Sequence, residues 1–105
     1  MEVTKSAVMI IGQAINDEQA AEVRKELESC EVSQEPGFLT AQILGEENGS
    51  MVVFLVVFEK QMDRNMFCGS RCYRQFVRKT QHLLAGEYVV KCFTERPTMG
   101  YAVSV

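Results

Sequence analysis

The chain has 105 residues, of which 47% are hydrophobic and 24% charged, and this composition is typical of a single soluble globular domain. Its net charge of −3 argues against nucleic acid as the main partner, because surfaces that bind nucleic acid are usually basic. The longest apolar run is far shorter than the roughly 20 residues of a membrane-spanning helix, and the first residues do not resemble a signal peptide, so we expect a cytoplasmic protein that does not bind membranes.

A strand and then a helix are predicted at the start of the chain. Residues 7–15 are rich in branched apolar side chains, which favour a strand. Asn16 is a suitable N-cap, and Gln19, three residues later, completes a pair that resembles a capping box. The predicted helix continues to about Ser29 and places one apolar stripe toward the core, formed by Ala20, Val23 and Leu27.

An antiparallel hairpin follows. Residues 38–44 resemble a strand, and Asn48 with Gly49 is a strong signal for a tight turn, because both residues tolerate positive φ. Residues 51–58 are apolar without interruption. A strand with one wet face alternates between polar and apolar residues, so this strand should be covered on both faces.

Two further helices and a fourth strand are predicted in the second half. A short helix over about 60–68 and a longer one over about 70–84 are separated by Gly69 and Ser70, and the inward stripe includes Met62, Met66, Tyr73, Phe76, Val77, Leu83 and Leu84. Gly86 is the expected stop signal. Residues 88–95 form the predicted strand, and residues 99–105 form either a fifth strand or an arm that reaches a neighbour.

This order of elements is βαββαβ, which predicts an α+β, ferredoxin-like fold with a four-stranded antiparallel sheet and the helices on one side. The domain is expected to be single, over 1–105, with a core at about 7–95 and a C-terminal arm at 96–105. The other side of the sheet stays bare although its central strands are apolar on both faces. We therefore expect a homodimer in which two sheets close into a dimeric α/β barrel.

The element order resembles that of the antibiotic-biosynthesis-monooxygenase-like family of dimeric α/β barrels. The segments that carry the resemblance are Glu35-Pro36-Gly37-Phe38-Leu39, the end of the apolar strand at Phe58-Glu59, and Ser70-Arg71-Cys72-Tyr73-Arg74-Gln75-Phe76-Val77. The resemblance implies a cofactor-independent monooxygenase that acts on an aromatic or polyketide-like substrate. The alternative is a non-catalytic dimeric barrel that binds a small hydrophobic ligand or serves as an assembly module.

The chain departs from the family where a tryptophan often stands, because Phe58 occupies that position and the chain contains no tryptophan. For the haem-degrading members, matching the segments places Phe67 at a pocket tryptophan and Val77 at the histidine that binds iron. Valine cannot bind iron. His82 comes five residues after Val77 and therefore lies about 140° further around the helix, at roughly 100° per residue, where it is a poor substitute for the iron ligand. We therefore set haem degradation aside and expect no cofactor.

The resemblance implies a pocket for a small aromatic ligand between the sheet and the helices. Tyr73 is the residue expected to orient a phenolic substrate, although a packing tyrosine with its hydroxyl at the surface is the more common arrangement for a half-buried tyrosine. His82 is a candidate general base or a surface residue near a helix end. The expected ligand-binding residues are Gln13, Gln42, Phe58, Met66 and Phe67, and the two glutamines could instead be surface amides.

The remaining charged and sulfur-containing residues suggest no second site. Arg64, Arg71, Arg74, Arg78 and Lys79 have the spacing of a solvated helix face, which we favour over the alternative of an anion site. Cys68 and Cys72 are four residues apart and could form a redox or metal pair, but no further ligand stands at zinc-binding spacing. Spacing and compartment oppose a disulfide framework for the four cysteines, so reduced thiols are the default and no metal site is predicted.

Overall fold

The computed structural model describes residues 4–96 of the chain and confirms the predicted ferredoxin-like fold, with four strands and three α-helices. Two short 3-10 helices, η1 and η2, complete the described part. In chain order the elements are β1 (Ser6–Gln13), α1 (Asp17–Glu28), η1 (Val32–Gln34), β2 (Phe38–Gly45), β3 (Met51–Phe58), α2 (Gln61–Cys68), α3 (Arg71–Thr80), η2 (Gln81–Leu83) and β4 (Val89–Thr94).

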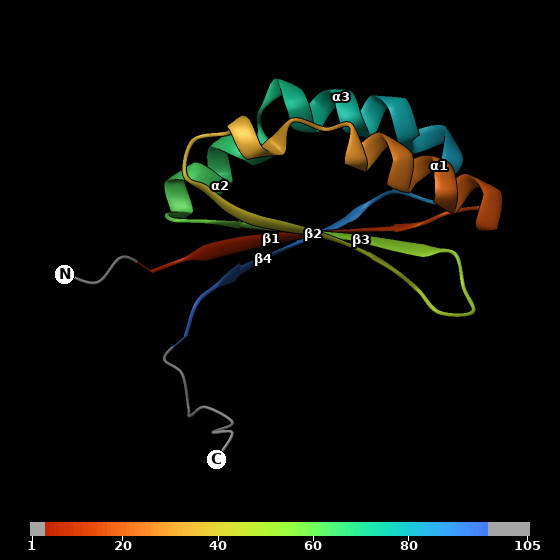
Figure 1. Ribbon diagram of the computed structural model, residues 1–105, viewed down its shortest axis with the longest axis horizontal. Coiled ribbons are helices and arrows are strands. Elements are labelled where there is room, and N and C mark those ends of the chain that lie inside the picture. The colour runs from red at the N-terminus through yellow and green to blue at the C-terminus, as the bar shows by residue number, and fades with distance from the viewer. Residues whose placement is uncertain (1–3, 97–105) are drawn as a thin grey trace, which may run out of the picture.

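The sheet is antiparallel throughout, with the strand order β2-β3-β1-β4. The uninterrupted apolar strand β3 is therefore central, as its composition predicted, and it pairs with β1 along its whole length, from Ser6 opposite Phe58 to Gln13 opposite Met51. All three α-helices lie on the same face of the sheet (Figure 1). The fold thus has two layers, and the helices cover only one side.

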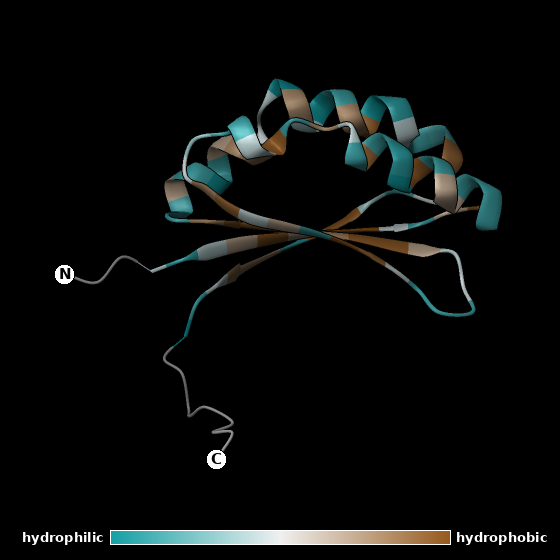
Figure 2. Ribbon diagram, viewed as in Figure 1, coloured by the Kyte–Doolittle hydropathy of each residue, from teal (hydrophilic) through white to brown (hydrophobic). Residues whose placement is uncertain are grey.

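The core lies between the helices and the central strands. Every second residue of β1 and β3 points toward the helices and is buried, whereas the residues between them are only half-buried. Figure 2 shows the same division, with apolar residues in the sheet and on the inner side of the helices and polar residues on their outer side. Fully buried core residues include Val8, Ile10, Val23, Val52, Val56, Phe58 and Phe67.

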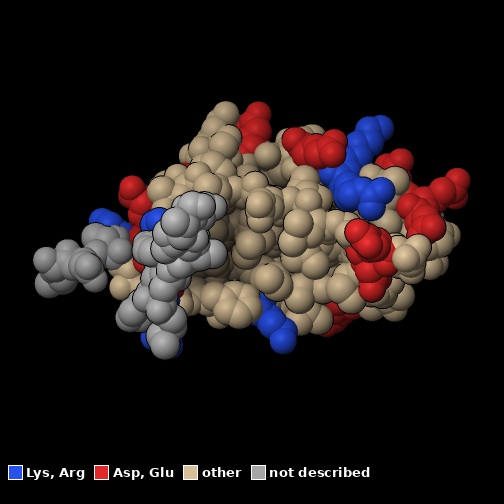
Figure 3. All heavy atoms as spheres, turned by 60° about the horizontal axis from the view of Figure 1, so that its bottom comes forward, with Lys and Arg blue, Asp and Glu red and all other residues tan. Residues whose placement is uncertain are grey.

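The opposite face of the sheet, here called the open face, is also largely apolar. None of the helices within residues 4–96 lies on it (Figure 1), and the view of this side in Figure 3 shows a broad uncharged area with charged residues mainly near its edges. Several side chains on it are well exposed, at 47% for Leu44, 50% for Val89 and 46% for Phe93. The strand registers assign to this face Ala7, Met9, Ile11, Leu44, Met51, Val53, Leu55, Val57, Val89 and Phe93.

The predicted inward stripe is wrong for α2. Met62 and Met66 are 69% and 56% exposed, and Arg64 and Phe67 turn inward instead. The prediction continued one helical phase across both helices. The break at Gly69, where α2 ends, resets that phase, so positions that would align in one long helix face different directions in two.

The C-terminal end of α3 and the end of β1 also differ from the prediction. Helix α3 stops at Thr80 rather than near residue 84, because the backbone beyond it pairs with the end of β1. The N–H of Ala85 donates to the carbonyl of Gln13 at 2.8 Å, and the N–H of Ile15 donates to the carbonyl of Leu83 at 3.0 Å. Strand β1 accordingly ends at Gln13, and the predicted element over 99–105 lies outside the described residues.

None of the helices in the described part of the chain has the length and apolarity needed to cross a membrane.

The burial pattern predicts unequal costs for the same substitution at two isoleucines. Ile10 is 1% exposed and Ile15 is 57% exposed. Ile10→Ala should lower the free energy of unfolding by about 2–5 kcal/mol, because it leaves a cavity in the core. Ile15→Ala should change it by about 0.5 kcal/mol or less. Urea unfolding of both variants measures the difference, and equal costs would contradict the assignment of the core.

Candidate functional site

The helices cover the central strands but leave the adjacent side of β4 exposed. Val90 pairs with Ile10 and shares its face of the sheet, yet Val90 is 40% exposed while Ile10 is buried. Cys92 likewise is exposed beside the buried Val8. We call the region where this side of β4 meets α2 and α3 the β4 flank, formed by Arg64, Cys68, Tyr73, Tyr88, Val90 and Cys92.

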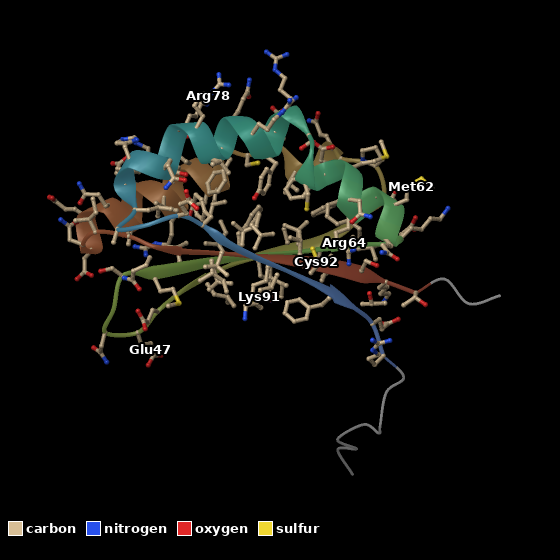
Figure 4. All side chains as sticks on the ribbon, turned by 180° about the vertical axis from the view of Figure 1, so that it is seen from behind. Glu47, Met62, Arg64, Arg78, Lys91 and Cys92 are labelled. Atoms are coloured by element: carbon tan, nitrogen blue, oxygen red, sulfur yellow. The ribbon has the colours of Figure 1, made fainter. Side chains whose placement is uncertain are left out.

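Arg64 is a buried cation in this flank, with only 6% of its surface exposed. Its Nη1 donates to the backbone carbonyl of Phe93 at 3.2 Å, and its Nε and Nη2 donate to Oδ1 of Asn65 at 3.3 and 3.1 Å. Figure 4 shows the side chain extending from α2 toward β4, close to Cys92. Because these partners are neutral, their hydrogen bonds satisfy the guanidinium without cancelling its charge, which is costly at a buried position.

Tyr73 is half-buried in the first turn of α3. Ser70 caps this helix, since its Oγ accepts a hydrogen bond from the N–H of Tyr73 at 3.2 Å. The Tyr73 ring packs edge-on against Phe67, with ring centroids 5.8 Å apart. Burial first, and then the thiols of Cys68 and Cys92, raise the pKa of Tyr73. The hydroxyl therefore stays protonated at neutral pH and can donate a hydrogen bond.

The Cys68 thiol has a similar environment. Burial is the largest cause that raises the pKa of Cys68, the neighbouring Cys92 raises it further, and the positive charge of Arg64 lowers it. Cys68 is thus held in its neutral form as well. The flank combines one buried positive charge with a neutral phenol and a neutral thiol.

Tyr88 closes the flank at the end near Thr80. The hydroxyl of Thr80 donates to the carbonyl of Phe76 at 2.9 Å, so the Tyr88 hydroxyl is the donor in its 2.6 Å bond to Thr80 Oγ1. The Tyr88 ring lies over Gly12, where a Cβ atom would collide with it. Burial is the largest cause that raises the pKa of Tyr88, to about 12.

The structure separates several of the predicted site residues. Gln13 and Gln42 are exposed on the open face, opposite Met51 and Leu55, and not on the helix side near Tyr73. The Gln13 amide donates to the carbonyl of Ala14 at 3.3 Å. Neither glutamine is therefore part of the β4 flank.

The aromatic and histidine candidates also lie at different depths. Phe58 and Phe67 are both buried in the core with ring centroids 5.4 Å apart, whereas Met66 is exposed. His82 is exposed in η2, beyond the end of α3. It lies nine positions after Tyr73 in the sequence, and nine positions span about 13 Å along a helix at 1.5 Å per residue. Of the predicted residues, Tyr73 and Phe67 contact each other beside the flank, and His82 is remote from it.

Arg64 is the site residue that sequence reasoning missed. It was grouped with Arg71, Arg74, Arg78 and Lys79, and those four are exposed as predicted; Figure 4 shows Arg78 pointing away from the sheet. A signal was present, because Arg64 lies three residues before the buried Phe67 and four before Cys68, on the same helix face. Arginine can bury its stem at such a position.

Hollows lined by described residues also lie outside the flank. One of about 320 Å³ lies between α1 and α3 and is lined by Glu26, Ser29, Cys30, Glu31, Arg71, Cys72, Gln75, Phe76 and Lys79. Another, of about 270 Å³, is lined by Lys5, Leu39, Glu59 and Lys60. Tyr73 lines neither of them. Within residues 4–96, no group of three or more His, Cys, Asp or Glu side chains is arranged to hold a metal ion.

Comparison with solved structures finds the same fold in several proteins, some of which are named as monooxygenases. A monooxygenase from Streptomyces coelicolor, ActVA-Orf6, solved in complex with nanaomycin D, aligns with a TM-score of 0.78 at 16% identity, over 94% of each chain. A protein named antibiotic biosynthesis monooxygenase aligns with a TM-score of 0.74 at 14% identity, over 88% of this chain and 99% of the other.

A Mycobacterium tuberculosis protein, Rv0793, aligns with a TM-score of 0.77 at 14% identity, over 91% of this chain and 99% of the other. No family model matches the sequence, and the search of curated proteins found no match. The predicted resemblance is thus confirmed at the level of fold, because identities this low do not establish a shared activity.

The raised pKa of Tyr88 predicts a loss of stability at alkaline pH. Its pKa is about 12 in the folded chain against 10.0 ordinarily, so its stabilising contribution is complete below pH 10 and is lost as the pH rises to about 12. Tyr88→Phe should therefore show a shallower decline over this interval, although the lost bond to Thr80 lowers its stability by about 1 kcal/mol at pH 9. Urea unfolding at pH 9 to 12 tests this, and parallel declines would contradict it.

Proposed function

We propose that the chain is a small cofactor-independent monooxygenase that acts on an aromatic or polyketide-like substrate at the β4 flank and works as a homodimer. The observation that carries this proposal is the buried guanidinium of Arg64, which has neutral hydrogen-bond partners and lies in the same flank as Tyr73. Such a charge favours an anionic oxygen of a ligand, and a phenol that reacts with oxygen does so through its phenolate.

The reaction needs no external reductant. A phenol and one O₂ molecule give a quinone and one water: one oxygen atom bonds to the ring carbon para to the hydroxyl, and the other leaves as water with the two hydrogens lost from the substrate. The substrate itself supplies the electrons. The protein has to favour the phenolate, orient the ring and limit side reactions.

The flank offers groups for these tasks. The Arg64 guanidinium would stabilise the phenolate oxygen, and the protonated Tyr73 hydroxyl would donate a hydrogen bond to a second oxygen of the substrate. The exposed Val90 offers an apolar surface for a flat ring. We leave His82 out of this site because it lies beyond the far end of α3.

The similar structures support the class of ligand. ActVA-Orf6 has this fold and binds nanaomycin D in its crystal structure. The present chain covers 94% of that protein, so nearly the whole fold that binds its ligand has a counterpart here. This is support by analogy of fold, and the argument from Arg64 is independent of it.

The homodimer is proposed from the open face. Its apolar residues span all four strands, and a strand as apolar as β3 needs cover on both sides. A second copy meets this need with the same surface, as in a two-fold interface. A stable interface of this type typically buries about 800 Å² per partner.

Substitutions in the β4 flank should lower the proposed activity without unfolding the chain. Arg64→Met keeps much of the buried stem and removes the charge, so oxygen uptake with anthrones or other phenols that carry hydrogen at the para carbon should fall about 100-fold, as for loss of one stabilising group. In Tyr73→Phe, oxygen uptake should fall by about 10-fold, since one hydrogen bond to the substrate is lost. Arg78→Met, at an exposed position of α3, is the control and should retain full activity.

Oxygen uptake equal to background with purified wild-type protein would count against the monooxygenase. If the same substrates nevertheless bind, and Arg64→Met weakens the binding of the phenolate form, the alternative of a non-catalytic barrel that binds a small hydrophobic ligand is the better description.

Charges placed on the open face should disrupt the proposed dimer. The double variant Val53→Glu and Leu55→Glu introduces two carboxylates at its centre, and unpaired charges in an interface strongly disfavour association. Light scattering should find a monomer or insoluble protein. Met62→Glu, at a 69% exposed position on α2, is the control and should remain dimeric. An unchanged dimer in the double variant would refute this interface.

A further inference from the structure

Two cysteines from distant parts of the sequence meet at the junction of α1 and α3. Cys30 follows Ser29, the C-cap of α1, and Cys72 is the second residue of α3. Their Sγ atoms are 2.7 Å apart although 42 positions separate the residues in sequence. A disulfide has an S–S length of about 2.05 Å, so a small approach of the two sulfurs would allow the bond to form.

The pair is accessible to small molecules. Both cysteines are half-buried, and both line the open hollow of about 320 Å³ between α1 and α3. The hollow is also lined by Arg71 and Lys79 and by Glu26 and Glu31, so charges of both signs surround it. A small oxidant can therefore reach the thiols without unfolding of the chain.

From this geometry we infer that Cys30 and Cys72 form a reversible intramolecular disulfide when the protein meets hydrogen peroxide. The overall change is two thiols and one H₂O₂ giving one disulfide and two waters; the sulfurs lose two electrons and the peroxide gains them. In a reducing compartment such a disulfide is transient and responds to redox conditions.

The positions of the two thiols assign their roles. Cys72 lies in the first turn of α3, where the helix dipole favours a negative charge, so it attacks the peroxide as a thiolate and becomes a sulfenic acid with release of water. The sulfur of Cys30 then attacks the sulfur of Cys72. The S–O bond breaks, and the departing hydroxide takes the proton of Cys30 as a second water.

The environment of Cys30 supports this order. Burial, followed by the hydrogen bond and charge of Cys72, raises the pKa of Cys30 to about 12. Cys30 thus remains a thiol until its partner has been oxidised. The other neighbouring thiols, Cys68 and Cys92, are the competing pair, but the close sulfur contact belongs to Cys30 and Cys72.

The main experiment uses the full chain with Cys68→Ser and Cys92→Ser, so that only the proposed pair remains. Peroxide treatment should remove two titratable thiols, and peptide mass spectrometry should find Cys30 linked to Cys72 within one chain. The melting temperature should rise by roughly 10 °C, because the cross-link closes a long loop in the unfolded chain. Dithiothreitol should reverse both changes.

The matched control is the full chain with Cys30→Ser and Cys72→Ser, which retains the other two thiols and should show no rise in melting temperature. Wild-type protein provides a second test that no substitution can disturb: after the same treatment, peptide mapping should find the same link between Cys30 and Cys72. Two free thiols at positions 30 and 72 after peroxide, or a link from either one to Cys68, Cys92 or another chain, would overturn the inference.

Single variants test the assigned order. Cys30→Ser should accumulate a sulfenic acid at Cys72 that a dimedone probe labels, because no partner resolves it. Cys72→Ser should give at least about tenfold less labelling at Cys30, whose thiol is protonated. The reverse pattern would contradict the roles of the two residues.

Discussion

The antiparallel pair of β1 and β3 at the centre of the sheet carries apolar side chains on both faces, and the helices can cover only one of them. The helix-facing half builds the core around Val8, Ile10, Val56 and Phe58. The remaining half forms the open face, on which no helix of residues 4–96 lies (Figure 1). The proposed dimer follows from this asymmetry, because apolar surface gains roughly 25 cal/mol for each Å² removed from water.

The same two-layer arrangement produces the β4 flank. Helices α1 to α3 pack mainly on the central strands, and β4 lies at the edge of the sheet. Arg64 reaches this edge and holds its charge there among neutral partners. A phenolate oxygen about 4 Å from a charge gains about 1 kcal/mol in water but about 4 kcal/mol at the effective dielectric of a protein surface region. The difference of about 3 kcal/mol corresponds to roughly a hundredfold in rate, so at the proposed site the burial of Arg64 would contribute more than its charge alone.

Local patterns predicted the fold well, because each element carries its own signal. The Asn16 cap is observed, with its side chain accepting from the N–H of Gln19 at 3.0 Å, and Asn48 adopts the positive φ of 57° that the hairpin turn requires. The uninterrupted apolar strand over Met51–Phe58 is central, as predicted. These features depend on neighbours in sequence or on burial alone.

The features that were predicted wrongly depend on contacts between elements that are distant in the sequence. Whether Arg64 is buried is decided by the width of the helix layer and by the carbonyl of Phe93, which is 29 positions away in sequence. The sequence showed Cys72 four residues from Cys68, whereas its sulfur partner is Cys30. Gln13 and Gln42 were correctly placed in strands, but only the strand register shows that both belong to the open face.

The break between α2 and α3 links the two sites argued for above. Ser70 starts α3 afresh, so Cys72 and Tyr73 are consecutive residues of its first turn and point about 100° apart, at 3.6 residues per turn. Cys72 consequently faces α1 and its thiol partner, while Tyr73 faces Phe67 and the β4 flank. A covalent bond at Cys72 would tie this turn to the end of α1 and restrict the movement of the Tyr73 backbone. The position of the phenol in the flank and the redox state of the thiol pair therefore depend on the same turn of helix.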